Sequence, residues 1–436
     1  MFCRMTRPVE GVSRRTLLGG LAAACTASFP HFASAAARTP VPLEARAESL
    51  TLGPGRSPSQ VWRLAAPAPV LRLRRGAALD LALANRLAKP MALTGRGLIT
   101  PPPLLVQAPV GPGSRASLAA AASWAGTGLL DLRLLADGAP APSRPLPLIV
   151  DETDALNVDN DEVFLVEDFR INADGVAVAP GVEAKDAELL YTVNGQAQPD
   201  IPLRGHARVR LRFINGCHRA VIAIKIAELD AVRVMAIDSQ PAEPFLARNG
   251  AVVLPPGGRS DVFIDMPVAK APLPVLLHDG TAARPIARLV ASNEPPLRAA
   301  PLPQAPALPS NGLPDKLDLR TAVRAELVLD GPDWRPPTQF SASSSPAFQA
   351  KAGRVVVLAL ANKAAGTTVV HLHGQPFRLL DRLDDGWKPY WLDTLALETG
   401  QTQRIAFPTE ATGRFLIESM ATSWAAPRLL RWYEIK

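Results

Sequence analysis

Two histidines separated by a single residue are the side chains of this sequence that are best suited to bind a metal. His371 and His373 lie in the run His-Leu-His-Gly at 371–374. Residues i and i+2 of a β-strand point to the same face, so the two imidazoles can reach one metal ion. The pair is therefore a candidate metal site. The alternative is a structural pair that forms hydrogen bonds between domains.

The remaining histidines and the cysteines offer no second group of this kind. His206, His218 and His278 each stand beside turn residues or charges, where surface or capping roles are expected. Cys217 is the only cysteine beyond the first 35 residues, and we expect it to be a small buried thiol. The sequence contains no pattern typical of a nucleophilic triad, a phosphate-binding loop or an iron–sulfur cluster.

The composition favours an all-β protein with several domains. The chain has 436 residues, which is more than one hydrophobic core usually serves, and 44 of them are prolines. Prolines suit many short strands and turns better than long helices. The formal net charge of +7 includes four arginines in the first 35 residues. The net positive charge of the rest of the chain is too small to imply nucleic-acid binding.

The first 35 residues have the features of a twin-arginine signal peptide. Arg14 and Arg15 precede a small, apolar stretch at 19–28, and a small-residue cleavage site follows at 33–35. The apolar stretch is shorter than the roughly 20 residues that a bilayer requires, and Pro30 interrupts it. We therefore expect export to the periplasm by the twin-arginine route and no transmembrane segment in the mature chain.

One strand pattern occurs three times along the chain. Each copy ends in asparagine and follows a turn that contains glycine, and the copies span 79–85, 208–215 and 354–362. We also expect 71–74 and 79–85 to pair with each other across the turn at Gly76.

Three copies of one pattern predict three related β-sandwich domains. We place the domains at residues 36–150, 151–292 and 319–436. The segment 293–318 between the last two is rich in proline, and we expect it to be an extended, semi-rigid linker.

Several short motifs, taken in order, resemble the multicopper oxidase superfamily, whose members contain three cupredoxin-like domains with a Greek-key β-sandwich fold. The resemblance covers nearly all of the chain beyond residue 35, so it implies the same all-β fold here. The motifs lie at residues 147–152, 193–195, 210–215, 236–238, 256–259, 371–374 and 393–394.

The resemblance also implies which residues should bind copper. Such oxidases hold a three-copper cluster with four His-x-His motifs, and a type 1 copper with two histidines and a cysteine; imidazole and thiolate are ligands that copper prefers. Of the eight histidines of the cluster, this chain keeps His371 and His373. The other three motifs read Thr94-Gly95-Arg96, Asp131-Leu132-Arg133 and Glu418-Ser419-Met420, and the type 1 positions read Thr368, Ser419, Trp424 and Leu429. We therefore expect no cofactor.

Within the superfamily the pattern most resembles the SufI (FtsP) group, whose copper-free members are exported by the twin-arginine route and support cell division. The local likeness lies at 91–98 and at 387–388. It implies a non-catalytic scaffold or interaction protein of the cell envelope, whose partner is a periplasmic or envelope protein such as a divisome component. The alternative is a copper-dependent oxidoreductase with a residual site at His371 and His373. A small-ligand site in the space of the lost cluster is a third alternative.

Four of the assigned ligand positions carry charge, namely Arg96, Asp131, Arg133 and Glu418. Three belong to the first predicted domain, and Glu418 belongs to the third. Arginine pairs with carboxylates through two parallel hydrogen bonds, so these residues predict an ion-pair network that clamps the two domains together. The alternative is that all four are solvated residues on loops.

Overall fold

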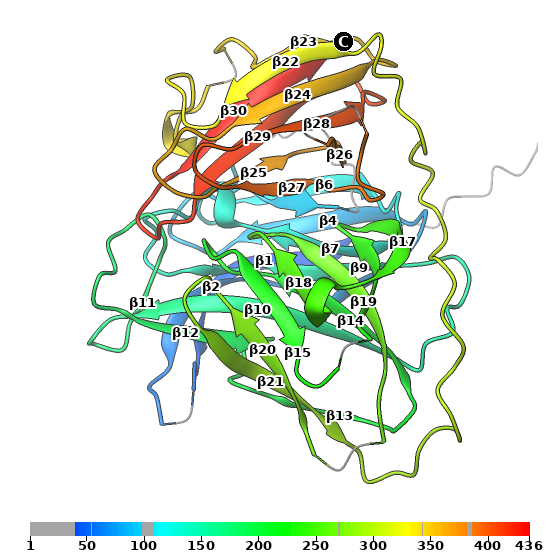
Figure 1. Cartoon of the computed structure of the whole chain (residues 1–436). Helices are drawn as coiled ribbons and strands as arrows, with labels where there is room; N and C mark the ends of the chain where they lie inside the picture. The colour runs from blue at the N-terminus through cyan, green and yellow to red at the C-terminus, as the bar shows by residue number, and fades with distance from the viewer. Residues whose placement is uncertain are drawn as a thin grey trace, which may run out of the picture. The chain divides into compact units, whose positions relative to one another are not determined.

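The computed structural model describes residues 40–53, 55–97, 109–229, 231–268, 271–341, 343–381 and 386–436, and the predicted signal peptide lies outside them. Residues 40–436 form one compact unit whose regular secondary structure is almost entirely β-strand (Figure 1). The described residues include three short 3-10 helices, at Arg133–Leu135 (η2), Arg248–Gly250 (η3) and Pro337–Gln339 (η4). The prediction of an all-β fold is confirmed. None of the helices in the described ranges is long and apolar enough to cross a membrane.

The first pair of sheets, here called the first sandwich, contains strands β1 to β9. One sheet has the order β6-β4-β1-β2-β8, and the other has the order β3-β9-β7-β5. A core rich in leucine, which includes Leu43, Leu81 and Leu148, lies between them. The strands are Val41–Leu50 (β1), Ser59–Ala65 (β2), Leu71–Arg74 (β3), Ala78–Asn85 (β4), Thr94–Arg96 (β5), Arg115–Ala121 (β6), Gly126–Asp131 (β7), Ser143–Arg144 (β8) and Leu146–Asp151 (β9).

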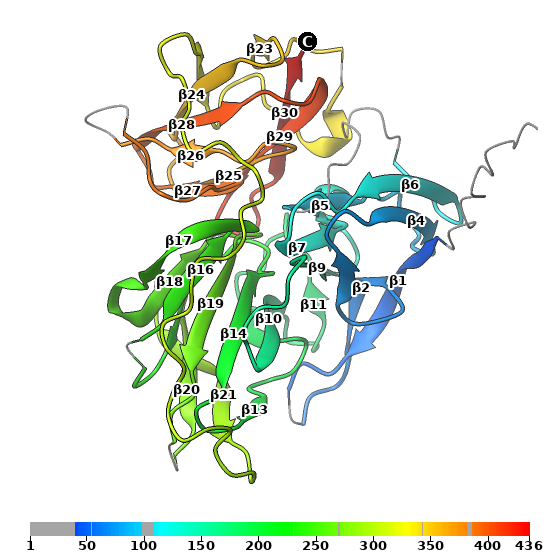
Figure 2. The ribbon, with the colours of Figure 1, turned by 90° about the vertical axis from the view of Figure 1, so that its right-hand side faces the viewer.

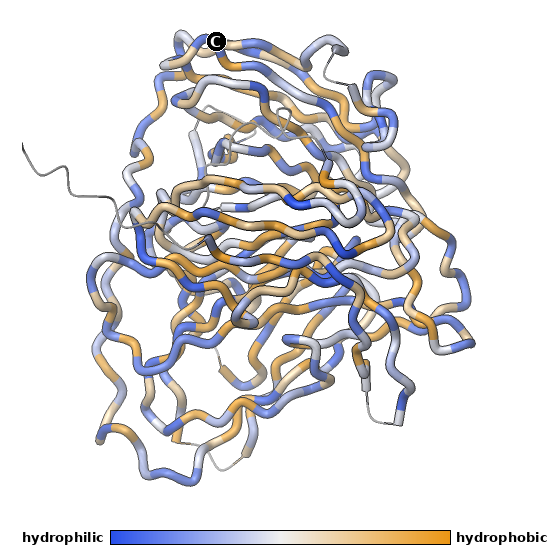
Figure 3. Tube along the Cα trace, turned by 180° about the vertical axis from the view of Figure 1, so that it is seen from behind, coloured by the Kyte–Doolittle hydropathy of each residue, from blue (hydrophilic) through white to orange (hydrophobic). Residues whose placement is uncertain are grey.

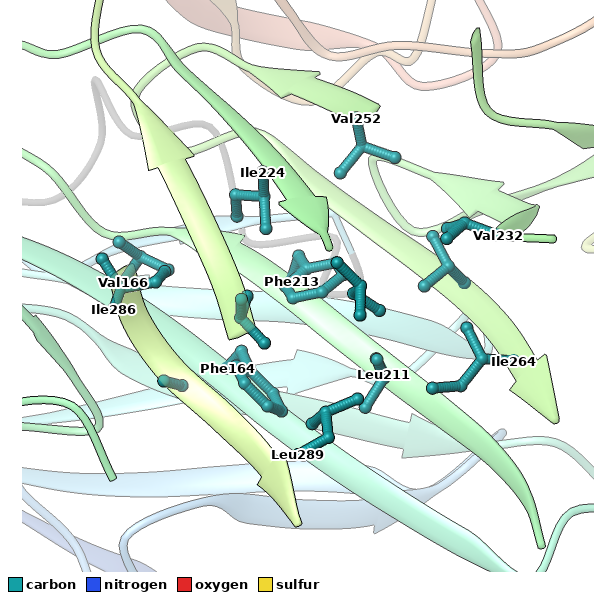
Figure 4. Packing of buried hydrophobic residues seen from close by; sticks show 14 of the residues in the cluster. Phe164, Val166, Leu211, Phe213, Ile224, Val232, Val252, Ile264, Ile286 and Leu289 are labelled. Carbon is teal, nitrogen blue, oxygen red and sulfur yellow. The ribbon is translucent and has the colours of Figure 1, made fainter. Parts of the chain in front are cut away.

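The second sandwich contains strands β10 to β21. Its sheets have the orders β11-β10-β14-β19-β16-β17, with β12 also paired to β10, and β13-β21-β20-β15-β18. Phe164, Phe213, Ile224 and Leu289 belong to its core (Figure 4). The strands are Asn160–Ile171 (β10), Ala177–Val178 (β11), Glu188–Val193 (β12), Asp200–Leu203 (β13), Arg208–Asn215 (β14), Ile222–Ile226 (β15), Arg233–Ile237 (β16), Gln240–Leu246 (β17), Ala251–Leu254 (β18), Arg259–Asp265 (β19), Leu273–His278 (β20) and Ala283–Ala291 (β21).

The third sandwich contains strands β22 to β30, in sheets of the orders β22-β24-β28-β26 and β23-β30-β29-β25-β27. Its core contains a group of stacked aromatic rings: the Tyr433 ring stacks on Phe348 and Phe415 at centroid distances of 4.8 and 5.4 Å. The strands are Val323–Val328 (β22), Gln349–Ala350 (β23), Val355–Ala361 (β24), Thr368–Leu372 (β25), Arg378–Leu379 (β26), Thr394–Leu397 (β27), Thr402–Pro408 (β28), Gly413–Ala421 (β29) and Arg428–Ile435 (β30).

The three sandwiches repeat one topology. In each, the opening strand pairs in parallel with a later strand, as β1 with β4, β10 with β14 and β22 with β24. The opposite sheet of each also contains a parallel pair, β3 with β9, β13 with β21 and β23 with β30. The internal repeat seen in the sequence is therefore a repeat of strand connections.

The recurring asparagines have the same hydrogen bonds in each copy. Asn85, Asn215 and Asn362 are all buried. Each accepts a hydrogen bond on Oδ1 from the main-chain N–H two residues later. Each also donates from Nδ2 to two main-chain carbonyls, one in the loop that follows and one in a more distant segment. The asparagine thus closes the loop at the end of its strand, which explains why the pattern ends there.

The predicted pairing of 71–74 with 79–85 is wrong. Strand β3 pairs with β9, whereas β4 pairs with β1 and β6 in the opposite sheet. The turn at Gly76, where φ is +80°, carries the chain from one sheet to the other. Hydrophobic and hydrophilic residues are interspersed along the chain trace in Figure 3. Their alternation identifies a strand but does not say which sheet the strand joins.

The proline-rich segment contains no strand or helix from 292 to 322. Figures 1 and 2 show it running along one side of the unit between β21 and β22. The Asn311 side chain anchors this segment. Its Oδ1 accepts a hydrogen bond from the main-chain N–H of Ala125, and its Nδ2 donates to the carbonyls of Ala125 and Ser239. The linker is therefore fixed to the first and second sandwiches at this residue.

Candidate functional site

The six residues that the sequence predicts for a site are all buried at places where the sandwiches meet. Arg96 and Asp131 end strands β5 and β7, which pair with each other, and Arg133 follows in η2. His371 in β25 lies directly opposite Glu418 in β29, and His373 follows the end of β25. Two antiparallel strand pairs, one from the first sandwich and one from the third, therefore position the site.

Arg96 contacts all three sandwiches. Its Nη2 lies 3.5 Å from Oε2 of Glu418, and its Nη1 donates to Oγ1 of Thr394 at 3.2 Å. From the second sandwich, Gly257 packs against the guanidinium so closely that a Cβ there would lie 2.9 Å from Cζ. Gly257 also has a φ of +82°, so glycine is required for two reasons. Burial lowers the pKa of Arg96, and the nearby carboxylates of Glu418 and Asp131 oppose that shift.

Glu418 is the centre of this cluster. It accepts a hydrogen bond from Nε2 of His373 at 2.5 Å, and its other oxygen is paired with Arg428 as well as with Arg96. Burial by itself would raise the pKa of Glu418, but Arg428 and Arg96 hold it well below its usual range. The carboxylate is therefore ionised and has a partner on each oxygen.

Asp131 and Arg133 form a separate pair, which joins the first sandwich to the second. Nε of Arg133 donates to Asp131 at 2.7 Å, and its Nη1 donates to the carbonyls of Gly216 and Cys217 at 2.9 and 3.0 Å. Burial would raise the pKa of Asp131, but Arg133 and Arg96 lower it on balance. No ion pair joins Arg133 to Glu418, although both lie in the described part of the chain. Of the four charged residues, only Arg96 and Glu418 are paired between the first and third sandwiches.

The two histidines lie with their ring centroids 4.4 Å apart. His373 donates from Nε2 to Glu418, because an ionised carboxylate can only accept. His371 donates from Nδ1 to the carbonyl of Asp393 at 2.9 Å, so its Nε2 carries a lone pair. That Nε2 is buried and has no partner among the described residues. Burial, together with the charge of Arg96, lowers the pKa of His371 to about 3, and the ring is neutral at ordinary pH.

A second buried cluster joins the second and third sandwiches. Arg259 donates to both oxygens of Asp393, at 2.7 and 2.9 Å, and its Nε donates to the carbonyl of Thr127 in the first sandwich. Asp238 accepts hydrogen bonds from the main-chain N–H groups of Arg259, Asp393 and Thr394. Burial and the neighbouring Asp393 raise the pKa of Asp238 to about 6. The pKa of Asp393 would also rise on burial, but Arg259 holds it well below its usual range.

A third cluster also contacts all three sandwiches. Asp137 of the first sandwich accepts from Nη2 of Arg219 at 2.9 Å and from the main-chain N–H of Arg428 at 2.6 Å. Arg219, in the second sandwich, donates in turn to the carbonyl of Ala426 in the third at 3.0 Å.

Sequence reasoning missed the roles of Arg219, Arg259, Asp238 and Arg428. Arg259 and Asp238 lie in the motifs 256–259 and 236–238, on which the family resemblance rests. The charged residue in each of these two motifs was therefore a usable signal, because a charge that is buried in a sandwich needs a partner.

Side chains at the positions that the family resemblance assigns to a type 1 copper make hydrogen bonds to other parts of the protein. Ser419 donates from its hydroxyl to the carbonyl of Leu329 at 2.8 Å, and Thr368 donates to Asn362 at 3.1 Å. Trp424 reaches the second sandwich, where its Nε1 donates to the carbonyl of Ala179 at 3.1 Å. Side chains at these positions are thus used in packing and in the contact between sandwiches.

The residues at the cluster positions do not fit a three-copper cluster. Three arginine side chains lie at or beside these positions and carry a permanent positive charge, namely Arg96, Arg133 and Arg428. His373 uses its Nε2 proton on Glu418, so this nitrogen offers no lone pair to a metal. Within the described residues there is no group of three or more His, Cys, Asp or Glu side chains that could hold a metal ion. A cavity beside His371 and Gln375 measures about 30 Å³, which is enough for one water molecule.

Comparison with known proteins agrees with this fold. Residues 313–435 match the family model described as multicopper oxidase. No curated protein matches the sequence.

Solved structures are similar over most of the chain. A multicopper oxidase from Pseudomonas thermotolerans is 24% identical and has a TM-score of 0.77, over 91% of this chain and 98% of that one. Lac15 from a marine microbial metagenome is 22% identical, with a TM-score of 0.75 over 91% and 100%. McoA multicopper oxidase from Aquifex aeolicus is 15% identical, with a TM-score of 0.72 over 91% and 96%. The cupredoxin-like fold predicted from the sequence is confirmed, and the chain has the fold of a multicopper oxidase.

Proposed function

We propose that this chain is a copper-free, non-catalytic relative of multicopper oxidases that acts in the periplasm by binding another protein of the cell envelope. The observation that carries the proposal concerns Ser419. The family resemblance assigns this position to the cysteine that binds a type 1 copper, and here the Ser419 hydroxyl donates a hydrogen bond to the carbonyl of Leu329. Cys217 is the only free cysteine of the described chain, and it is buried in the core of the second sandwich. A type 1 copper requires a thiolate, and no described residue supplies one at this site.

The ion pairs at the cluster positions support the same proposal. Arg96, Glu418 and Arg428 give these positions a structural use, which is to hold the sandwiches together. The predicted twin-arginine signal supports a periplasmic location. The resemblance to the SufI (FtsP) group supports a partner in the cell-division machinery.

Copper stoichiometry tests the absence of an oxidase site. Purified protein is incubated with excess copper, desalted and measured by elemental analysis, with the His371→Ala/His373→Ala double variant as the matched control. We expect well under one copper per chain, the same value for both proteins and no phenol oxidase activity. A blue absorbance near about 600 nm, typical of a copper thiolate, would overturn the proposal.

The alternative function is a copper-dependent oxidoreductase with a residual site at the two histidines. One observation favours it: the buried Nε2 of His371 carries a free lone pair and is oriented by a hydrogen bond on Nδ1. One copper per wild-type chain that is lost in the double variant would support this alternative.

A complementation experiment tests the role in cells. The His371→Ala/His373→Ala variant is expressed in a strain that lacks the gene, and growth and cell length are measured. We expect the variant to restore the wild-type phenotype as well as the wild-type chain does, because a binding protein does not need those imidazoles. Failure of a variant that is stably present in the periplasm would contradict a metal-independent role.

A further inference from the structure

A groove of about 840 Å³ lies between the second and third sandwiches, and Arg219 of the third cluster is one of the residues that line it. Its walls come from β10 and β12, from the turn between β20 and β21, and from the segment of the third sandwich that contains Trp424. The volume falls within the range of small-molecule sites in proteins, which is roughly 300–1,000 Å³.

The sequence of β10 changes character where it reaches this groove. Phe164 and Val166 point into the core of the second sandwich. Residues two apart share a face of a strand, so Asp168 and Arg170 continue the same face, and both line the groove. Tyr191 of β12 lies directly opposite Asp168 and lines it too. The face of β10 that carries apolar core residues earlier in the strand thus carries charged residues here, with an aromatic residue beside them on β12.

Among the described residues that line the groove, Arg170 is a cation without a counter-ion. Its Nε is buried and has no hydrogen-bond partner, and no carboxylate pairs with its guanidinium in the described part of the chain. The other arginines of the lining are paired, Arg219 with Asp137 and Arg284 with Asp279. The carboxylates of the lining are also engaged, Asp168 with His218, Asp279 with Arg284, and Glu398 with Gln401. Arg170 is therefore the charged side chain of the described lining that has neither an ion pair nor a hydrogen-bond partner.

Aromatic rings beside the arginines give the groove a fixed apolar surface. The guanidinium carbon of Arg170 lies 5.7 Å from the centroid of the Trp424 ring, and that of Arg284 lies 5.9 Å from the Tyr191 ring. Trp424 is held by its hydrogen bond to Ala179, and Tyr191 by one to Asp279. Both rings are thus in place before any ligand arrives.

We propose that this groove binds a small organic carboxylate that carries an aromatic or apolar body. Arg170 supplies the charge, because its planar guanidinium can donate two parallel hydrogen bonds to a carboxylate. Trp424 and Tyr191 supply the surface for the ring. The proposal goes beyond the copper-free function and does not depend on it, since no metal takes part in this recognition.

Calorimetric titration with 2-naphthoate tests the proposal, with 2-naphthalenemethanol as the uncharged ligand of similar shape. The measurement is made on the wild-type protein in EDTA, so that copper plays no role. We expect one naphthoate per chain, and binding of the alcohol that is at least about tenfold weaker, a difference of 1.4 kcal/mol. Equal affinities for the two ligands, or no binding of naphthoate, would overturn the proposal.

Three variants locate the site. Arg170→Gln should bind both ligands equally weakly. Val253→Glu places a negative charge at a groove residue whose relative exposure is 66%, and it should weaken naphthoate at least about tenfold with little cost to folding. Arg320→Gln, at a side chain that is 91% exposed and outside the groove, should bind like the wild type. Unchanged naphthoate affinity in Arg170→Gln and Val253→Glu would place the ligand elsewhere and reject the groove.

Discussion

The guanidinium of Arg96 and the carboxylate of Glu418 approach to 3.5 Å between the first and third sandwiches, and both side chains are at least 95% buried. They occupy positions that the family resemblance assigns to histidine ligands of copper. A charged pair of this kind contributes little net stability, because desolvation of the two ions offsets their attraction. Loss of one member is costly, however, because it leaves the other buried without a partner.

Removal of the Glu418 charge should therefore destabilise the protein strongly. Glu418→Gln leaves Arg96 and Arg428 without a carboxylate, and we expect a loss of about 3–5 kcal/mol in the free energy of unfolding. Denaturant titration of Glu418→Gln, Arg96→Met and the double variant measures the coupling between the two sites. We expect a coupling energy of at least about 1 kcal/mol.

Arg133 is the matched control for that experiment. It is as buried as Arg96 and also carries a positive charge, but its ion pair is with Asp131. The cycle of Arg133→Met with Glu418→Gln should therefore show a smaller coupling than the cycle of Arg96 with Glu418. Equal couplings in the two cycles, or additive losses of a few tenths of a kcal/mol throughout, would reject the clamp.

Asp238 should make stability depend on pH in the direction opposite to that of an ordinary ion-paired carboxylate. Its pKa is about 6 in the folded protein, against about 3.9 in an unfolded chain. Between these values the folded state binds more protons, so the contribution of Asp238 is complete below about pH 4 and is lost as the pH rises through 6. Two pKa units correspond to about 3 kcal/mol at most.

The Asp238→Asn variant isolates this effect. The stability of the wild type relative to the variant should increase as the pH falls from 7 to 4, as measured by denaturant titration at each pH. Asp174→Asn, at an exposed carboxylate, is the reference. The opposite trend would show that the three main-chain donors to Asp238 keep it ionised.

The export signal gives a prediction that rests on sequence alone. Replacement of Arg14 and Arg15 by lysine should leave the precursor in the cytoplasm, because the arginine pair is the address that the twin-arginine route recognises. Cell fractionation and immunoblotting measure the distribution. Normal periplasmic amounts of the double variant would show that the chain is exported by another route.

The sequence predicted the fold well because its signals are local. A strand that alternates in hydropathy and ends in asparagine can be recognised within about ten residues, and three copies suffice to suggest three sandwiches. The pairing of β3 with β9 could not be predicted in this way. It depends on the turn at Gly76, which carries the chain to the opposite sheet, and on a partner more than 70 residues away.

The site was predictable only in part for a similar reason. Arg96 and Glu418 stood at positions that a family pattern marks, so their meeting was an expected consequence of the fold. Arg428 lies in none of these motifs, and Arg259 lies in one, 256–259, that is not a ligand motif; the partners of both lie in other segments of the chain. Which of several buried arginines pairs with which carboxylate is decided by packing, and a single sequence does not contain that information.

The repeated asparagines should each be important for stability. Asn362 satisfies three main-chain groups, since it accepts from the N–H of Ala364 and donates to the carbonyls of Gly366 and Leu397. Asn362→Ala leaves these buried or half-buried groups without partners, and each loss costs about 1 kcal/mol or more. We therefore expect a loss of about 2–4 kcal/mol by denaturant titration, and the same for the equivalent changes at Asn85 and Asn215. Asn157→Ala, on an exposed loop, should change stability by less than about 0.5 kcal/mol. A loss that small at the buried positions as well would mean that water replaces the side chain there.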